Sequence, residues 1–375
     1  MSIWLADNPP SERWPLYTRG SIGEVLPDVI PPLLWDTYGQ EAENGFRSAC
    51  RDLGLLMPGD IPDDEPRTIL GVFGGYCYLN ASFLRLLGVR APGGSVEAIE
   101  RQFFGEYDAP AYAERPGDRN RRSTARLAKT VLEILGVGHL DDLEGLESDR
   151  RRVAAWLAQF PTDGPDGAPA DDRTLLDYMA GFKPLFEHLL RRHVVTTMAA
   201  TLASGAVGDL LTKIGHQDHL ASILGGIGDV DSARHDPDTE HVRRSRRRSI
   251  AVAEVQARLN PIDRRLFAKA LQATNVHSQA REQSKTTITN GVRGARRAHR
   301  LLAQRAAERG GSPNLERSCL LSFDEFSRYV ADPTPWADVL AERSELRESL
   351  TDLIPPFFLD GQVLPITTWE RRNRS

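Results

Sequence analysis

Apolar residues recur with helical spacing over most of the chain beyond residue 120. Leu127, Val131 and Leu135 are four residues apart, so they fall on one face of a helix. The stretch from Asp263 to Arg309 has a similar period and contains no proline. Its length and its lack of helix breakers predict two or more long packed helices.

The first 120 residues have a different pattern, in which proline and glycine interrupt the apolar positions. Prolines are dense at the start of the chain, at Pro9, Pro10, Pro15, Pro27, Pro31 and Pro32. Because proline breaks helices, this region is expected to hold loops and short elements. Helices are predicted from about Leu33 to Leu53, ending at Gly54, and from Tyr78 to Leu87.

Two loops are predicted inside the helical region, near residues 161–172 and 225–248. The first is rich in proline and glycine, which prevent any regular element. The second begins with glycines and ends in a basic run, Arg243–Arg248. That run is expected to be a solvated helix start or a docking patch, with nucleic-acid binding as the alternative.

Capping residues mark further helix ends. Asp171 or Asp172 can cap a helix that Pro184 then interrupts. Near the C-terminus, Cys319–Leu321 is expected to be a short extended segment, and Ser322 can cap the helix that follows it.

Together these patterns predict a mostly α protein with three regions. An irregular, Pro/Gly-rich N-terminal lobe with short helices covers residues 1–120. A multi-helix domain with long packed helices covers residues 121–350, and a C-terminal tail over the surface covers residues 351–375.

Composition narrows the class of protein. The 375 residues are 40% hydrophobic and 26% charged, which is ordinary for a globular protein and argues against disorder. The net charge of −5 argues against a general nucleic-acid binder. The cysteines, Cys50, Cys77 and Cys319, are far apart and odd in number, so a disulfide scaffold is not expected.

The N-terminus and the most apolar stretch bear on localisation. The first ten residues have neither the basic region nor the apolar core of a signal peptide. The stretch from Val194 to Leu211 is interrupted by Thr196, Ser204 and Asp209, which predicts a buried helix pair instead of a membrane span. We therefore predict a cytoplasmic protein without a membrane partner.

Two N-terminal segments resemble a known family. Residues 14–35, WPLYTRGSIGEVLPDVIPPLLW, resemble the sequence that follows the ATP-binding domain in phosphoenolpyruvate synthase-like enzymes and rifampicin phosphotransferases. Residues 73–80, FGGYCYLN, are similar to a Gly-x-x-Tyr-x-Asn element of the same family. Weaker likeness continues through residues 225–233, 280–285 and 319–326.

The resemblance implies the central substrate-binding or linker region of these phosphoenolpyruvate-utilising phosphotransferases. Their nucleotide-binding and phosphohistidine domains are not recognisable in the sequence, and none of the nine histidines has a Gly-Gly-x-x-x-His-Ala context. Phosphoryl transfer depends on positioning and on charge stabilisation by cations and metals, so this chain is not expected to be catalytic alone. ATP-grasp and mobile phosphohistidine proteins are the implied partners. They would use ATP and Mg²⁺, whereas this chain is expected to bind no cofactor.

Candidate ligand-binding residues come mainly from the two N-terminal segments. Arg19 can hold Glu24 or an anionic ligand, although an ion pair that anchors the loop is the simpler interpretation. Trp35 and Tyr78 can form an aromatic wall or pack in the core. Asn80 offers both donors and an acceptor, so Arg19, Trp35 and Asn80 are predicted to meet in one site.

Two further groups are weaker candidates. Arg281 lies where relatives carry an Arg-Glu pair on a long helix, and its neighbour Glu282 is not expected to pair with it. His216, Asp218 and His219 are metal-binding residue types within one turn, but no distant ligand is apparent, so no metal site is predicted.

Two functions remain open from the sequence. The first is a substrate-binding or scaffold subunit that works with separate ATP-binding and phosphohistidine proteins on a small organic substrate. The alternative is a non-catalytic protein that binds a small molecule such as a natural product. No catalytic residue is assigned in either case, because no nucleophile with an adjacent base can be assembled from the sequence.

Overall fold

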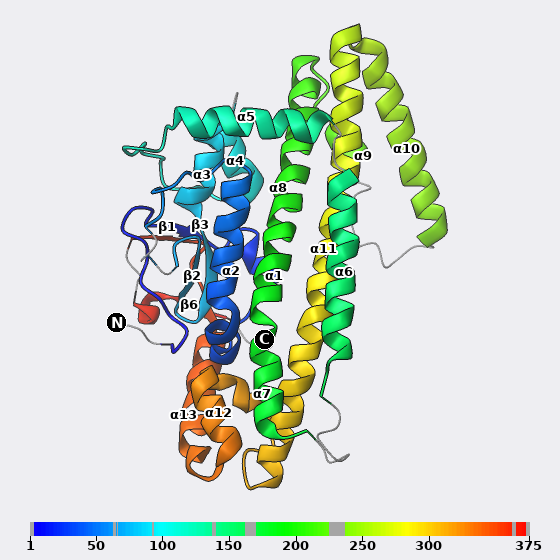
Figure 1. Cartoon of the computed structure of the whole chain (residues 1–375). Coiled ribbons are helices and arrows are strands. Elements are labelled where there is room, and N and C mark those ends of the chain that lie inside the picture. The colour runs from blue at the N-terminus through cyan, green and yellow to red at the C-terminus, as the bar shows by residue number, and fades with distance from the viewer. Residues whose placement is uncertain are drawn as a thin grey trace. The chain divides into compact units, whose positions relative to one another are not determined.

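A computed structural model of the chain is mostly α-helical, as predicted (Figure 1). It describes residues 4–62, 65, 67–91, 94–136, 140–161, 170–224, 237–361 and 365–372. The centres of both predicted loops, residues 162–169 and 225–236, lie outside the described residues, and so does the family-like segment 225–233.

The chain forms two compact units whose boundaries differ from the predicted ones. Unit 1 consists of Met1–Leu127, Val153–Arg191 and Thr289–Ser375, and unit 2 consists of Ala128–Arg152 and Arg192–Ile288. Sequence patterns mark where helices begin and end, but long helices such as those here contribute residues to both units. A boundary placed at a loop near residue 120 therefore misses the division.

A small antiparallel sheet lies in unit 1. Its strand order is β2-β3-β1-β5, with β1 at Leu16–Thr18, β2 at Leu70–Phe73, β3 at Tyr76–Asn80 and β5 at Phe358–Asp360. The turn between β2 and β3 is Gly74-Gly75, and both glycines have positive φ, 55° and 83°, as a two-residue hairpin turn requires.

This hairpin corrects the prediction of a helix from Tyr78 to Leu87. The glycine pair folds the second apolar run back on the first, so Tyr78 pairs with Gly71 in the sheet. The helix α3 begins only after the strand, at Ala81–Arg90.

The C-terminal segment is part of the fold of unit 1 and not only a surface tail. β5 pairs with β1, and a second pair joins β4, Leu353–Ile354, to β6, Glu370–Arg371. Leu359 and Trp369 are buried. The predicted tail therefore supplies a strand and core side chains.

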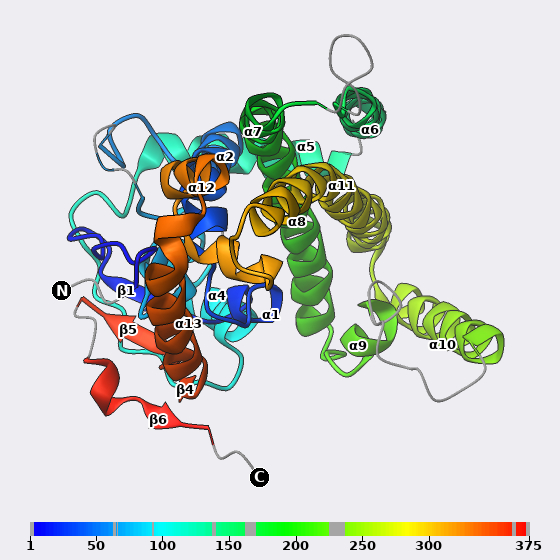
Figure 2. The same cartoon turned by 90° about the horizontal axis from the view of Figure 1, so that it is seen from below.

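Unit 1 also contains several helices besides α3. They include α1 at Ile22–Val25, α2 at Pro32–Asp52, α4 at Val96–Phe104, α7 at Asp172–Gly181, α12 at Phe323–Ala331 and α13 at Ala337–Thr351. Short 3₁₀ helices accompany them, at Leu315–Leu320, Thr334–Trp336 and Ile366–Thr368. Figure 2 shows α2, α7 and α12 side by side, and their buried residues form one cluster that includes Leu33, Leu176 and Phe326.

Several predicted helix ends are confirmed. The α2 bounds match the prediction within one residue. Asp171 caps α7 by accepting a 2.7 Å hydrogen bond from the Thr174 N–H. The helix ends at Gly181, shortly before Pro184. Ser322 forms a full capping box with Glu325 at the start of α12. By contrast, Cys319 lies at a 3₁₀ helix and not in an extended segment.

Four long helices each have residues in both units. They are α5 at Arg121–Gly136, α6 at Leu140–Ala158, α8 at Lys183–Lys213 and α11 at Pro261–Glu308. The prediction of two or more helices between Asp263 and Arg309 is wrong, because α11 is continuous. Its glycines serve close packing: a Cβ at Gly291 would lie 2.5 Å from the Phe182 ring.

The remaining helices belong to unit 2. They are α9 at His219–Leu224 and α10 at Pro237–Arg258, and they lie next to each other (Figure 2). The basic run Arg243–Arg248 lies in α10, which agrees with the predicted helix start, although the loop was predicted to extend to residue 248. Side chains from α8, α9, α10 and α11 share one apolar cluster, which includes Leu211, Ile223, Val255 and Phe267.

One stretch, Asp172–Lys213, is long and apolar enough to cross a membrane by length and composition. Buried helices of soluble proteins meet the same criteria, so this property alone does not indicate a membrane. The stretch comprises α7 and α8, and α8 is unbroken. The predicted helix pair between Val194 and Leu211 is thus a single helix.

Candidate functional site

Arg19 follows strand β1 and is buried within unit 1. Its guanidinium donates to the carbonyl oxygens of Cys77, at 2.5 Å, and of Leu26 and Pro27, both at 3.1 Å. It also lies over the Tyr76 ring, 5.3 Å from the centroid. Burial lowers the pKa of Arg19 from its ordinary value. These contacts make Arg19 a brace between strand β3 and the loop after Ile22–Val25 in unit 1.

The other predicted residues of unit 1 also have structural partners. Asn80 caps α3: its Oδ1 accepts from the Phe83 N–H at 2.8 Å, and its Nδ2 donates to the Trp14 and Thr68 carbonyls. The Tyr78 hydroxyl donates to the Pro356 carbonyl at 3.0 Å.

Trp35 and Glu24 lie in other surroundings. The Trp35 ring is buried on α2 with the Arg67 guanidinium 5.1 Å from its centroid. Glu24 is exposed on α1, and the described part of the chain has no ion pair between it and Arg19. The polar atoms of Arg19 and Asn80 therefore face different partners, and the contacts do not join them with Trp35 in one site.

Replacing Arg19 with alanine is expected to lower the free energy of unfolding by about 2–3 kcal/mol, because hydrogen bonds from a charged group are lost and buried carbonyls are left unpaired. Urea unfolding followed by tryptophan fluorescence measures this loss. The matched control is Glu24→Ala, which removes an exposed charge and should change little. An unaltered unfolding midpoint for Arg19→Ala would show that the brace does not matter.

Unit 2 contains a buried stripe of polar residues on α11. Residues spaced by three or four positions fall on one helix face, which is normally apolar when it packs inside a protein. Here that face carries Thr274, His277, Ser278, Ser284 and Thr287, each at most 8% exposed. Buried polar side chains are more informative than exposed apolar ones. The stripe therefore marks unit 2 as a candidate for polar ligand binding.

A hydrogen-bonded group at this stripe joins α8 to α11 within unit 2. Nδ1 of His193 lies 3.0 Å from the Ser284 hydroxyl, and the Thr196 hydroxyl lies 3.4 Å from the same oxygen. The Ser284 hydroxyl also lies 2.8 Å from the Arg281 carbonyl and donates to it. A serine has a single hydroxyl hydrogen, so when that hydrogen goes to the Arg281 carbonyl, Nδ1 of His193 is the donor to Ser284.

This network sets the state of the His193 ring. With its hydrogen on Nδ1, the ring has a lone pair on Nε2. Burial lowers the pKa of His193 to about 4, and the positive charge of Arg281 adds to the effect. The imidazole is thus neutral at pH 7. It can accept a hydrogen bond from a ligand hydroxyl through Nε2, but it cannot act as a cation.

Positive charge at the same turn comes from Arg281 and Lys285. Both side chains lower the pKa of His193 through their positive charge. Nη2 of Arg281 lies 2.8 Å from Glu282 Oε1, so these neighbours do pair, contrary to the sequence-based expectation. Long side chains can meet even where their Cα atoms are adjacent. Arg281 is the one predicted ligand-binding residue that lies beside this group.

His193 and Ser284 were not among the residues predicted from the sequence. The signal was present as polar residues at positions 274, 277, 278, 281 and 284, where a core-facing helix would carry apolar ones. Apolar residues such as Ala270, Ala273 and Ala280 are interspersed among them, and they gave the stretch an ordinary amphipathic pattern.

A second histidine group, in unit 1, has the residue types of a nucleophile and a base. Nε2 of His299 lies 2.9 Å from the Ser318 hydroxyl and 3.5 Å from Cys319 Sγ. Burial raises the pKa of the Cys319 thiol to about 11 and lowers the pKa of His299 to about 4. A reactive cysteine needs a depressed pKa. The group is therefore a neutral structural contact.

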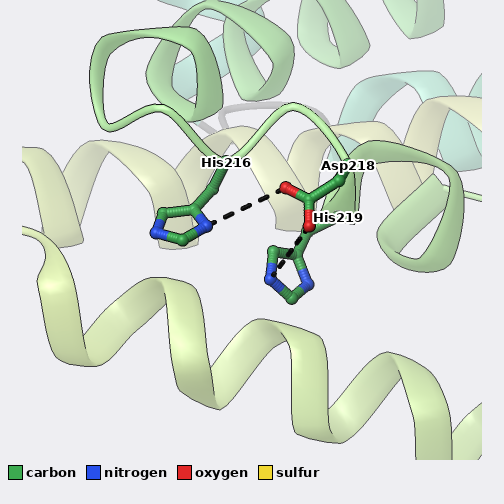
Figure 3. A group of neighbouring side chains, drawn as sticks. All are labelled: His216, Asp218 and His219. Atoms are coloured by element: carbon green, nitrogen blue, oxygen red, sulfur yellow. Dashed lines mark ion pairs between the residues drawn. The ribbon is translucent and has the colours of Figure 1, made fainter.

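A third group lies in the turn between α8 and α9 of unit 2 (Figure 3). One ligand atom from each of His216, Asp218 and His219 lies within 4.8 Å of the others. The Asp218 carboxylate points between the two rings, 3.9 Å from a nitrogen of each. Glu254, from α10, lies 3.5 Å from Nε2 of His219. These are the described residues best suited to hold a metal ion.

Comparisons with known proteins add no assignment to this geometry. No protein-family model matches the chain, and no curated protein matches it. Its function must therefore be inferred from the residues and contacts described above.

Proposed function

We propose that the chain is a substrate-binding or scaffold subunit of a cytoplasmic phosphotransferase system similar to phosphoenolpyruvate synthase and rifampicin phosphotransferase. ATP-binding and phosphohistidine proteins would act in trans. The chain itself would hold a small organic acceptor.

The observation that carries this proposal is the polar stripe of α11 with its His193–Ser284 pair. A phosphoryl acceptor bears a hydroxyl or carboxylate oxygen. The neutral Nε2 of His193 can accept from a hydroxyl, while the Ser284 oxygen and the threonines of the stripe offer further polar contacts. Arg281 and Lys285 supply the positive charge that suits an anionic or phosphorylated group.

The same residues argue against independent catalysis by this chain. Phosphoryl transfer needs a bound nucleotide or a phosphohistidine, together with metal and cationic stabilisation of the transferring group. The His193 ring is neutral and held by Ser284, so it would orient an acceptor. The phosphoryl donor would come from a partner protein.

The first test concerns phosphorylation of the chain alone. Purified protein incubated with radiolabelled ATP, or with phosphoenolpyruvate, is expected to remain unlabelled and to release no phosphate. Labelling of any histidine in the absence of other proteins would reject the proposal.

The second test concerns binding at the stripe. Rifampicin and pyruvate are suitable probes, because they represent the phosphoryl acceptors of the two enzyme classes that the N-terminal segments resemble. Arg281→Met is expected to weaken binding of a probe roughly 10- to 100-fold, since a hydrogen bond from a charged group is worth about 1.5–3 kcal/mol. Ser284→Ala should weaken it roughly 5-fold, as expected for about 1 kcal/mol.

Thr286→Ala is the matched control, because Thr286 is exposed on the same helix and its hydroxyl donates to the Glu282 carbonyl. Equal affinities for all three variants, or no binding of either probe to the wild type, would contradict the proposal. If the probes bind but no partner protein transfers phosphate to them, the chain is instead a non-catalytic small-molecule binder.

A further inference from the structure

We propose that unit 2 binds a zinc ion between the α8–α9 turn and α10. His216, Asp218 and His219 would supply three ligands, and Glu254 would supply the fourth. This site involves none of the residues of the His193–Ser284 pair, so it does not depend on the proposed function.

A glycine-based helix end positions the first ligand. The Gly215 N–H bonds the Thr212 carbonyl at 3.1 Å, and the His216 N–H bonds the Leu211 carbonyl at 2.9 Å. This is the Schellman arrangement, which needs a residue with positive φ. Gly215 provides it, with φ 71°. The chain therefore turns sharply after α8 and directs His216 back over the helix end.

The second histidine is fixed by the start of α9. The His219 N–H donates to the His216 carbonyl at 3.2 Å, so the two residues close a tight turn with Asp218 between them. Side-chain exposure is 19% for His216 and 21% for His219. The rings are thus largely shielded, with centroids 5.4 Å apart, and the more exposed Asp218 carboxylate lies between them (Figure 3).

Apolar packing holds α10 against this turn. Ile223 of α9 is fully buried in the same cluster as Val255 and Leu259. Glu254 precedes Val255, so it projects beside the apolar face of α10 and reaches His219. The apolar core therefore holds Glu254 beside the turn. Glu254 is the distant fourth ligand that the spacing of His216, Asp218 and His219 does not provide.

The donor set suits zinc better than magnesium or calcium. Zinc is bound by imidazole nitrogens and carboxylate oxygens at about 2.0–2.2 Å, usually with four ligands. Four such ligands lie about 3.3 Å from one another around the ion. The three ligand atoms in the turn are already within 4.8 Å, so modest side-chain rotations bring them into range. Magnesium and calcium prefer oxygen ligands only.

Arg258 competes with the metal for this group. It lies one helical turn after Glu254, and its guanidinium contacts Nε2 of His216. Nδ1 of His216 faces Asp218, so zinc would bind through Nδ1 and leave a hydrogen on Nε2. Nε2 could then no longer accept from Arg258, and this exposed side chain would turn toward solvent.

Zinc binding to the untagged, full-length protein tests the site. Titration with ZnCl₂ against a chromophoric chelator is expected to give one ion per chain, and the same titration with MgCl₂ should give none. His216→Ala and His219→Ala should each weaken zinc binding about 100-fold or more, since even groups that only support a ligand are worth 10–100-fold. Asp209→Asn, an exposed carboxylate near the end of α8, is the control and should bind like the wild type.

A variant that binds zinc more tightly shows that the weaker binding of the histidine variants does not come from misfolding. Arg258→Leu removes the competing guanidinium, so zinc should bind up to about 10-fold more tightly, the change expected when a hydrogen bond to a charged donor is removed. The proposal is overturned if the wild type binds no zinc, if the histidine variants bind as tightly as Asp209→Asn, or if Arg258→Leu binds no more tightly than the wild type. None of these measurements includes an organic ligand, so their outcome is separate from that of the binding test for the proposed function.

Discussion

Replacing Glu43 with alanine is expected to lower the free energy of unfolding of unit 1 by about 3–5 kcal/mol, the range for removing one partner of a buried ion pair. Glu43 lies on α2 with 0% exposure. Nε of Arg47, one turn later, donates to its Oε1 at 2.7 Å. The loss would be a large share of the net stability of a typical domain, about 5–15 kcal/mol.

The same carboxylate also binds the start of strand β2. It accepts the backbone N–H groups of Thr68, Ile69 and Leu70 at 2.9–3.1 Å. β2 is the outer strand of the sheet, so these N–H groups have no neighbouring strand to pair with on that side. Alanine would leave them buried without an acceptor, together with an unpaired Arg47.

Tryptophan fluorescence follows unit 1 selectively, because every tryptophan of the chain lies in it: Trp4, Trp14, Trp35, Trp156, Trp336 and Trp369. Urea titrations of Glu43→Ala should show an early loss of the folded fluorescence, while Glu24→Ala, on an exposed helix, should match the wild type within about 0.5 kcal/mol. A Glu43→Ala midpoint equal to that of Glu24→Ala would show that the Glu43 carboxylate does not stabilise the start of strand β2.

Helices and their ends were the most predictable part of the fold. Periodic apolar residues, Pro31-Pro32 at the start of α2 and the cap at Asp171 depend on local physics, so the sequence shows them directly. The hairpin at Tyr78 was missed because an apolar run of that length fits a buried helix or a strand equally well. Only the pairing with Gly71, a tertiary contact, decides between them.

The candidate sites were less predictable because their residues are distant in sequence. His193 and Ser284 are 91 residues apart, and Nδ1 meets the hydroxyl only after α8 packs on α11 in unit 2. Glu254 likewise meets His219 only because α10 packs against α9. Conversely, Arg19 and Asn80 have the residue types of a binding site, but their hydrogen bonds go to backbone groups of unit 1. Residue type alone does not separate a brace from a ligand contact.

The second large effect is expected at Arg90, a fully buried arginine at the end of α3. Its Nη1 and Nη2 bind the two oxygens of the Asp60 carboxylate at 2.6 and 3.1 Å. The remaining hydrogens go to the carbonyls of Leu55, Gly117 and Asp118, at 2.6–2.8 Å. All five guanidinium hydrogens are therefore used, and one side chain ties α3 to two separate loops.

Arg90→Ala is expected to lower the free energy of unfolding by about 3–5 kcal/mol, because the buried Asp60 carboxylate would lose its arginine and the carbonyls of Gly117 and Asp118 would lose this donor. Arg90→Lys should recover only part of this loss, since a single ammonium cannot replace a planar fork of five donors. The matched control is Arg119→Ala in the neighbouring loop, where the ion pair with Glu114 is exposed and worth at most about 1 kcal/mol. Full recovery by lysine, or an Arg90→Ala midpoint no lower than that of Arg119→Ala, would show that the fork geometry does not hold these loops.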